Sequence, residues 1–146
     1  RPGIQAVCDE VKRHGRLLHV HFHGHCLDTV ADFGAMGIDC VCPFERPPGG
    51  DIVGIEGLRT VRELLDGRTT MNGNVHTVDT LIRGTPDDVR REVAEILEAF
   101  DGCPRVIVGT GDQVGLETPE PNLMAMIEAV KKVGKSAPEC PPTTRR

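Results

Sequence analysis

The sequence predicts an α/β fold whose parallel sheet is built from four strand–helix units. Short stretches with the apolar or alternating pattern of strands take turns with longer stretches whose apolar residues recur at helical spacing. Glycines separate most of the helical stretches from the strands that follow them. Four such units are half of an eight-unit parallel (β/α)8 barrel of the TIM type, so a sheet made of them alone keeps two unpaired edges.

The first predicted strand, 16–23, carries histidines at every second position. Side chains alternate between the two faces of a strand, so His19, His21 and His23 share one face and the apolar residues between them share the other. A row of imidazoles on one face is costly to bury without partners, which indicates a functional role. His19 lies deeper along the strand and is expected to be a buried supporting residue, whereas His25 follows a glycine and is expected at the rim.

The other elements follow from the same two periodicities and from turn residues. The later strands are expected over 38–42, 69–72 and 105–110. Helices are expected over 1–14, 27–36, 55–65, 77–82, 85–101 and 118–133. The segment Thr85-Pro86-Asp87-Asp88 has the N-cap, the first-turn proline and the acidic first turn of a helix start. The polar, proline-rich stretch 136–146 is predicted to be a disordered tail, so the folded domain is expected to cover 1–135.

Composition narrows the class of protein. The formal net charge is −5 and no basic block is present, which argues against nucleic acid or an anionic membrane as partner. No apolar run is long enough to cross a bilayer. The six cysteines are irregularly spaced, which favours reduced thiols in a cytoplasmic protein over a disulfide framework. The chain begins at Arg1, inside a predicted helix and without a methionine, which favours a fragment of a longer protein.

Candidate site residues follow from one rule of parallel α/β folds, which place their sites at the carboxyl ends of the strands. Those ends carry His21 and His23 on the first strand, 42–45 on the second, 72–74 on the third and 110–112 on the fourth. We therefore expect these groups to converge although they lie far apart in the sequence.

The expected convergence contains the ligands of a metal ion. His21 and His23, two residues apart on one strand, can both reach one ion, and a carboxylate from Asp112 or Glu45 would complete a three-ligand site with an open position. The alternatives stay open at this point: a histidine pair of this kind can simply form hydrogen bonds, and Glu45 can pair with a nearby arginine. The dipeptide 73–74 can be no more than a turn.

Five motifs, taken together and in this order, resemble the uroporphyrinogen decarboxylase superfamily. They are His21-Phe22-His23-Gly24, Gly37-Ile38-Asp39, Met71-Asn72-Gly73-Asn74-Val75, Gly84-Thr85-Pro86-Asp87-Asp88-Val89 and Thr118-Pro119-Glu120-Pro121-Asn122-Leu123. The resemblance runs from about Gly15 to Gly134. It implies a (β/α)8 barrel of which this chain is the C-terminal half, strands five to eight.

The superfamily has two branches, and the chain departs from both. Zinc-dependent methyltransferases, which move methyl groups between corrinoid proteins and thiols, carry one histidine and two cysteines at the metal. His21 matches that histidine, whereas His23 and Asp112 stand where the cysteines would be. The metal-free decarboxylases place a histidine beside the position of Gly111, and that histidine is absent here.

The resemblance therefore implies a metal-dependent enzyme of the methyltransferase branch. His21, His23 and Asp112 would hold zinc or another divalent ion, and Glu45 would be a fourth ligand or the base. Asn74 and His25 would contact a small-molecule substrate, a thiol or similar acceptor. A corrinoid, carried by a corrinoid protein, would be the methyl donor.

Partners and alternative functions complete these expectations. The missing N-terminal half, or a second copy of the chain, is expected to close the barrel. The alternative functions are a metal-free lyase related to uroporphyrinogen decarboxylase, and an inactive or self-associating fragment. A metal-dependent amidohydrolase is disfavoured, because that class adds further histidines and a lysine at other strand ends.

Overall fold

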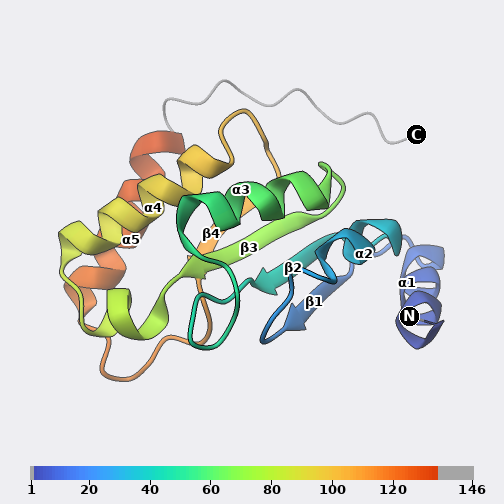
Figure 1. The fold of residues 1–146 in the computed structure, drawn as a ribbon, viewed down its shortest axis with the longest axis horizontal. Helices are drawn as coiled ribbons and strands as arrows, with labels where there is room; N and C mark the ends of the chain where they lie inside the picture. Colours follow the sequence, from blue (N-terminus) through green and yellow to red (C-terminus); the bar gives the residue numbers. More distant parts are fainter. Residues whose placement is uncertain (1, 135–146) are drawn as a thin grey trace.

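The chain folds into a sheet of four parallel strands in the order β1-β2-β3-β4, with helices along it, as seen in a computed structural model that describes residues 2–134 (Figure 1). The strands are β1 (His19–Phe22), β2 (Cys40–Pro43), β3 (Thr70–Val75) and β4 (Val106–Thr110). Every neighbouring pair is parallel, so all carboxyl ends lie at the same edge. The predicted α/β fold with a partial (β/α)8 barrel is confirmed.

Helices follow the strands in the expected alternation. They are α1 (Pro2–Arg13), α2 (Val30–Ala35), α3 (Gly54–Leu65), the π-helical segment η1 (Thr77–Ile82), α4 (Pro86–Ala99) and α5 (Glu120–Gly134). Figure 1 shows α1 beyond the β1 end of the sheet and α5 at the opposite end, beside α4. The predicted tail 136–146 lies outside the described residues.

One face of the sheet packs against the helices and forms the core. Val41 and Met71 are buried on this face, and the rings of Phe22 and Phe33 meet at 5.7 Å, which joins β1 to α2. The residues that alternate with them face the other way. Among these, Ile107 is 51% exposed, because no described element covers that face. The face of the sheet that would line the interior of a complete barrel is therefore exposed.

The strand boundaries differ from the sequence prediction by up to three residues, and the two largest differences are at the start of β1 and the end of β3. β1 begins at His19 rather than at residue 16, because the backbone N–H of Leu18 donates to the side chain of Asp39 (2.7 Å). β3 continues to Val75, past the dipeptide that resembled a turn. Gly73 makes this possible: its φ is +149°, and a side chain there would collide with the carbonyl of Pro43.

The start of α4 is the clearest local signal that the structure confirms. The Thr85 backbone N–H donates to Asp88 Oδ2 (2.8 Å) and the Asp88 N–H donates to Thr85 Oγ1 (3.3 Å), which is a capping box. We expect Thr85→Ala to lower the free energy of unfolding by about 1 kcal/mol, because the Asp88 N–H loses its acceptor, the Thr85 hydroxyl oxygen. Urea unfolding checks this against Thr60→Ala, an exposed helical threonine of α3. Equal stabilities of the two variants would contradict it.

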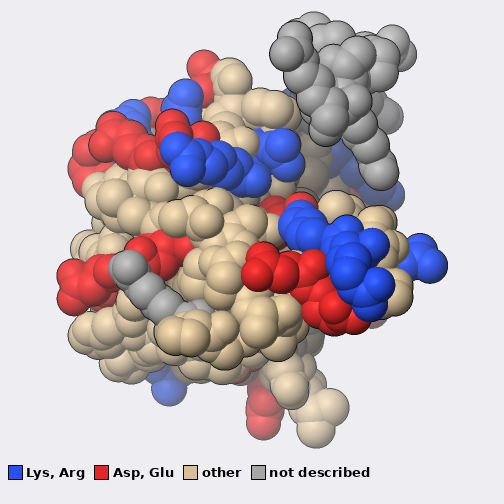
Figure 2. Space-filling model, turned by 90° about the vertical axis from the view of Figure 1, so that its right-hand side faces the viewer, with Lys and Arg blue, Asp and Glu red and all other residues tan. Residues whose placement is uncertain are grey.

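Charges of both signs lie close together on the surface. On the side viewed in Figure 2, acidic and basic side chains are interspersed. Two ion pairs involve the end of α1, Lys12 with Asp39 (2.5 Å) and Arg13 with Glu10 (2.6 Å). The structure contains, within 2–134, no helix with the length and apolarity that crossing a membrane requires.

Candidate functional site

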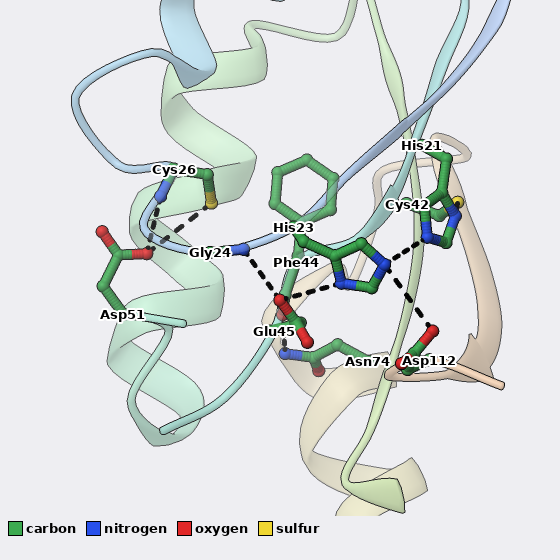
Figure 3. A network of polar contacts seen from close by, with 10 residues as sticks. All are labelled: His21, His23, Gly24, Cys26, Cys42, Phe44, Glu45, Asp51, Asn74 and Asp112. Atoms are coloured by element: carbon green, nitrogen blue, oxygen red, sulfur yellow. Dashed lines mark hydrogen bonds and ion pairs between the residues drawn. The ribbon is translucent and has the colours of Figure 1, made fainter. Parts of the chain in front are cut away.

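The carboxyl ends of β1 and β4 bring three metal-ligating side chains together. One ligand atom each of His21, His23 and Asp112 lies within 4.8 Å of the other two. His21 stands at the end of β1, His23 follows it, and Asp112 follows β4. Figure 3 shows the two imidazoles and the carboxylate pointing toward one another. The sequence rule on strand ends thus places these residues as expected, although β1 and β4 are at opposite edges of the sheet.

The contacts within this group are direct. His21 Nε2 and His23 Nε2 are 2.5 Å apart, and His23 Nε2 is 3.8 Å from Asp112 Oδ1. Asp112 is held by its own loop, because the Thr110 hydroxyl donates to the Asp112 carbonyl (2.5 Å) and the Gly111 N–H donates to the Val75 carbonyl (2.7 Å).

Glu45 sits behind His23, in the loop after β2. Its Oε2 accepts the N–H of Gly24 (2.8 Å) and lies 3.1 Å from His23 Nδ1. A carboxylate at this nitrogen favours the tautomer with the proton on Nδ1, which leaves Nε2 free to bind an ion. Within the described residues, Glu45 is not part of the three-residue ligand group. These contacts favour a role for Glu45 in orienting the His23 ring over a role as a fourth metal ligand.

A second carboxylate, Asp51, fixes the segment that follows the histidines. It accepts the backbone N–H groups of Cys26 (3.0 Å) and Leu27 (3.1 Å), as Figure 3 shows for Cys26. Burial raises the pKa of Asp51, but these hydrogen bonds outweigh it and leave the pKa below its ordinary value. Burial first, and then the charge of Asp51, raise the pKa of the Cys26 thiol to about 12. Cys26 is therefore a protonated, structural thiol.

We expect the hydrogen bonds of Asp51 to make stability depend on acid pH. The lowered pKa means that the contribution is complete above the ordinary value of 3.8 and is lost as the pH falls through the lowered value. Asp51→Asn should therefore be less stable than wild type at pH 7, with the difference shrinking toward pH 2. Urea unfolding across this range measures the effect, with the exposed Asp101→Asn as control. A difference that does not change with pH would contradict the assignment.

A cleft adjoins Asp112, one of the three candidate ligands, at the loops that follow β2, β3 and β4. It has a volume of about 240 Å³, and its lining includes Glu45, Asp112 and Asn74. The Asn74 side chain is buried; its Nδ2 donates to the carbonyl of Phe44 (2.9 Å), and its Oδ1 has no hydrogen-bond partner. A buried acceptor without a partner beside a cleft is a feature that a bound donor would satisfy.

One of the residues that line this cleft, Arg46, forms a buried ion pair with Glu92. Arg46 lines the cleft and its Nε lies 2.7 Å from Glu92 Oε1, but off the N–H direction, so this contact is an ion pair rather than a hydrogen bond. Glu92 Oε1 also accepts the N–H of His76 (2.9 Å), just beyond β3. Glu92 thereby connects α4 to the loops that shape the cleft.

Cys42 is the site residue that sequence reasoning missed as a functional group. Its Sγ lies 3.1 Å from His21 Nδ1, because β1 and β2 pair His21 directly with Cys42. Burial first, and then the charge of Asp112, raise the pKa of this thiol. The alternation of the second strand already placed Cys42 on the same face as Cys40, but only the strand register shows that it meets His21.

Two predicted residues are not part of this cluster. His25 is exposed and is not among the residues that line the cleft. His19 was expected to be buried, and this prediction is wrong: it is exposed and lines a separate cavity with Cys40 and Thr70 at the other end of the sheet. It is exposed because the inner face of the sheet has no cover among residues 2–134.

The donor set fits a divalent metal ion. Two imidazoles and one carboxylate are the ligands of three-ligand catalytic zinc sites, which keep one position open for water or substrate. The partial exposure of His23 and Asp112, with 48% and 42% of their side chains accessible, leaves this position open to solvent.

Comparisons with known proteins show the family and the fold of the chain. The chain is similar in fold to a methyltransferase from Methanosarcina mazei, with a TM-score of 0.71 and 21% sequence identity. The match covers 90% of this chain but 34% of the other, so the chain spans about a third of the length of that methyltransferase. No curated protein matches the chain. The profile described as uroporphyrinogen decarboxylase (URO-D) matches residues 1–133, and the chain therefore belongs to the uroporphyrinogen decarboxylase family.

Proposed function

We propose that the chain carries the metal-binding part of a methyltransferase that acts on a thiol or a similar acceptor. The observation that carries the proposal is the convergence of His21, His23 and Asp112, whose ligand atoms lie within 4.8 Å of one another. The resemblance to the methyltransferase branch supports zinc, or another divalent metal, as the ion. The fold of the methyltransferase from Methanosarcina mazei is consistent with this branch.

Each residue of the site has a task in this proposal. His21, His23 and Asp112 hold the ion. Glu45 keeps the proton of His23 on Nδ1, and because it also lines the cleft it can accept the proton that the acceptor loses. Asn74 presents an unpaired oxygen near the acceptor.

The ion supplies one thing when bound: it lowers the pKa of a thiol or water molecule beside it. An imidazole and a carboxylate in place of two thiolates leave the ligand set with about one unit less negative charge, which makes a stronger Lewis acid. The methyl donor is a corrinoid, and a corrinoid protein is its carrier in this proposal. His25, exposed near the rim, would meet the substrate.

The inner face of the sheet is exposed among the described residues, so we expect further protein to cover it. We propose that four further strand–helix units cover it, either from an N-terminal half or from a second copy of the chain. The open face, with Ile107 half exposed, and the two sheet edges support this. Light scattering on the purified chain distinguishes the sources: twice the mass of one chain indicates a second copy, and a monomer indicates the N-terminal half.

Methyl transfer from methylcobalamin to 2-mercaptoethanol tests the proposed activity. We expect the zinc-loaded chain, supplied with its partner half where light scattering requires one, to exceed the rates of free zinc and of His23→Ala. Equal rates would contradict the proposal. Decarboxylation of uroporphyrinogen by metal-free protein would instead favour the lyase activity for which the family is named.

A further inference from the structure

A row of polar contacts runs from Cys42 to Glu45 across both histidines. Cys42 Sγ is 3.1 Å from Nδ1 of His21, and Nε2 of the same ring is 2.5 Å from His23 Nε2. His23 Nδ1 in turn lies 3.1 Å from Glu45 Oε2. Figure 3 shows these four side chains in sequence, with Cys42 at the end away from Glu45. Each ring nitrogen of the two histidines therefore has a partner in the protein, and His23 Nε2 also lies 3.8 Å from Asp112 Oδ1.

The contact between Glu45 and His23 determines the proton positions in the metal-free site. The carboxylate favours a proton on His23 Nδ1, so His23 Nε2 is an acceptor. His21 Nε2, 2.5 Å away, must then be the donor, because two facing lone pairs at that distance repel. The other nitrogen of His21, Nδ1, is left as an acceptor, and the thiol S–H of Cys42 is the donor it faces.

A bound ion needs the opposite arrangement at His21. Both Nε2 atoms must present lone pairs, so the proton of His21 has to leave Nε2 and reside on Nδ1. There it points at the sulfur of Cys42. A thiol is both a weak donor and a weak acceptor, so rotation of the S–H lets the same atom serve either tautomer without changing its own protonation.

We propose that Cys42 is a positioning residue that allows His21 to move its proton from Nε2 to Nδ1 when the site binds a divalent ion. This inference rests on the proposed metal site. Cys42 acts through His21 and is not itself a ligand, because its sulfur is outside the group of ligand atoms that lie within 4.8 Å of one another. The direct pairing of His21 with Cys42 across β1 and β2 fixes the contact.

The experiment compares the full chain with Cys42→Ala, which removes both hydrogen-bonding roles, and Cys42→Ser, which keeps them. Cys40→Ala is the matched control, since Cys40 is on the same strand and face but pairs with His19. Zinc affinity is measured by competition with a chelator. The tautomer of His21 is read from its ring ¹⁵N shifts with and without zinc.

We expect Cys42→Ala to weaken zinc binding by about 10–100-fold, as the loss of a partner behind a histidine ligand does elsewhere. Cys42→Ser should bind within a few-fold of wild type, and Cys40→Ala like wild type. In wild type the His21 proton should sit on Nε2 without zinc and on Nδ1 with it. In metal-free Cys42→Ala the Nε2 preference should weaken.

Three results would overturn the inference: unchanged zinc affinity in Cys42→Ala, an unchanged His21 ¹⁵N pattern in that variant, or loss of zinc binding in Cys42→Ser. Failure of the proposed function has a different signature. Wild-type protein that binds no zinc would end the metal proposal, whereas the ¹⁵N comparison of metal-free wild type and Cys42→Ala would still decide the role of Cys42.

Discussion

Replacement of His23 by alanine is expected to weaken the binding of zinc by more than about 100-fold, because loss of a ligand costs more than the 10–100-fold typical of an outer partner. His23 is central to the site, since its Nε2 faces both His21 and Asp112 while its Nδ1 faces Glu45. His21→Ala and Asp112→Asn should each also weaken zinc binding, but by a smaller factor than His23→Ala. Isothermal titration with zinc measures all three.

His19→Ala is the matched control for this series. His19 lies on β1 on the same face as His21, is also exposed, and lines the separate cavity at the other end of the sheet. Its loss should leave zinc affinity within about 2-fold of wild type, because it removes an imidazole but no ligand. Equal losses from His19→Ala and His23→Ala would mean that zinc binds to the histidine-rich strand nonspecifically.

Replacement of Glu92 by glutamine is expected to lower the free energy of unfolding by about 3–5 kcal/mol, the range for a buried ion pair that loses one partner. The Glu92 side chain is 7% exposed and that of Arg46 is 14% exposed, so water is a poor replacement for the lost partner. The substitution leaves the arginine charge buried in the cleft. It also weakens the acceptor of the His76 N–H. Urea denaturation at pH 7 measures the loss.

Glu95→Gln serves as the control for Glu92→Gln. Glu95 is 3.8 Å from the same arginine but has a side chain that is 37% exposed, so its replacement should change stability by less than about 0.5 kcal/mol. The double variant Arg46→Met/Glu92→Leu should recover most of the stability, because it removes both charges together. A double variant as unstable as Glu92→Gln would show that the effect is not one of charge pairing.

Much of the site was predictable because parallel strands share one direction. That rule brought Asp112 and Glu45 to the same edge as His21 and His23, and the period of two assigned both histidines to one face. The family resemblance then favoured Asp112 as the third ligand. The capping residues of α4 were equally local, so Thr85 and Pro86 marked its start. What could be predicted was therefore set either within a few residues or by the common direction of the strands.

The remainder depended on contacts between elements that are distant in sequence. The partnership of Cys42 with His21 follows from strand register, which tertiary packing decides. Nothing in the local sequence distinguishes Glu92 from the exposed charged residues of α4, and only its ion pair with Arg46 shows it to be a buried partner. His19 was misplaced because the prediction assumed that both faces of the sheet were covered.

X-ray absorption spectroscopy at the zinc edge, on the chain loaded with one equivalent of zinc, tests the central claim most directly. We predict a first shell of nitrogen and oxygen only, at bond lengths of about 2.0–2.2 Å. The spectrum should also contain the outer-shell scattering of two imidazoles. His23→Ala should lose one imidazole from that pattern. A shell that contains sulfur at about 2.3 Å, or that shows no imidazole scattering, would contradict the site built from His21, His23 and Asp112.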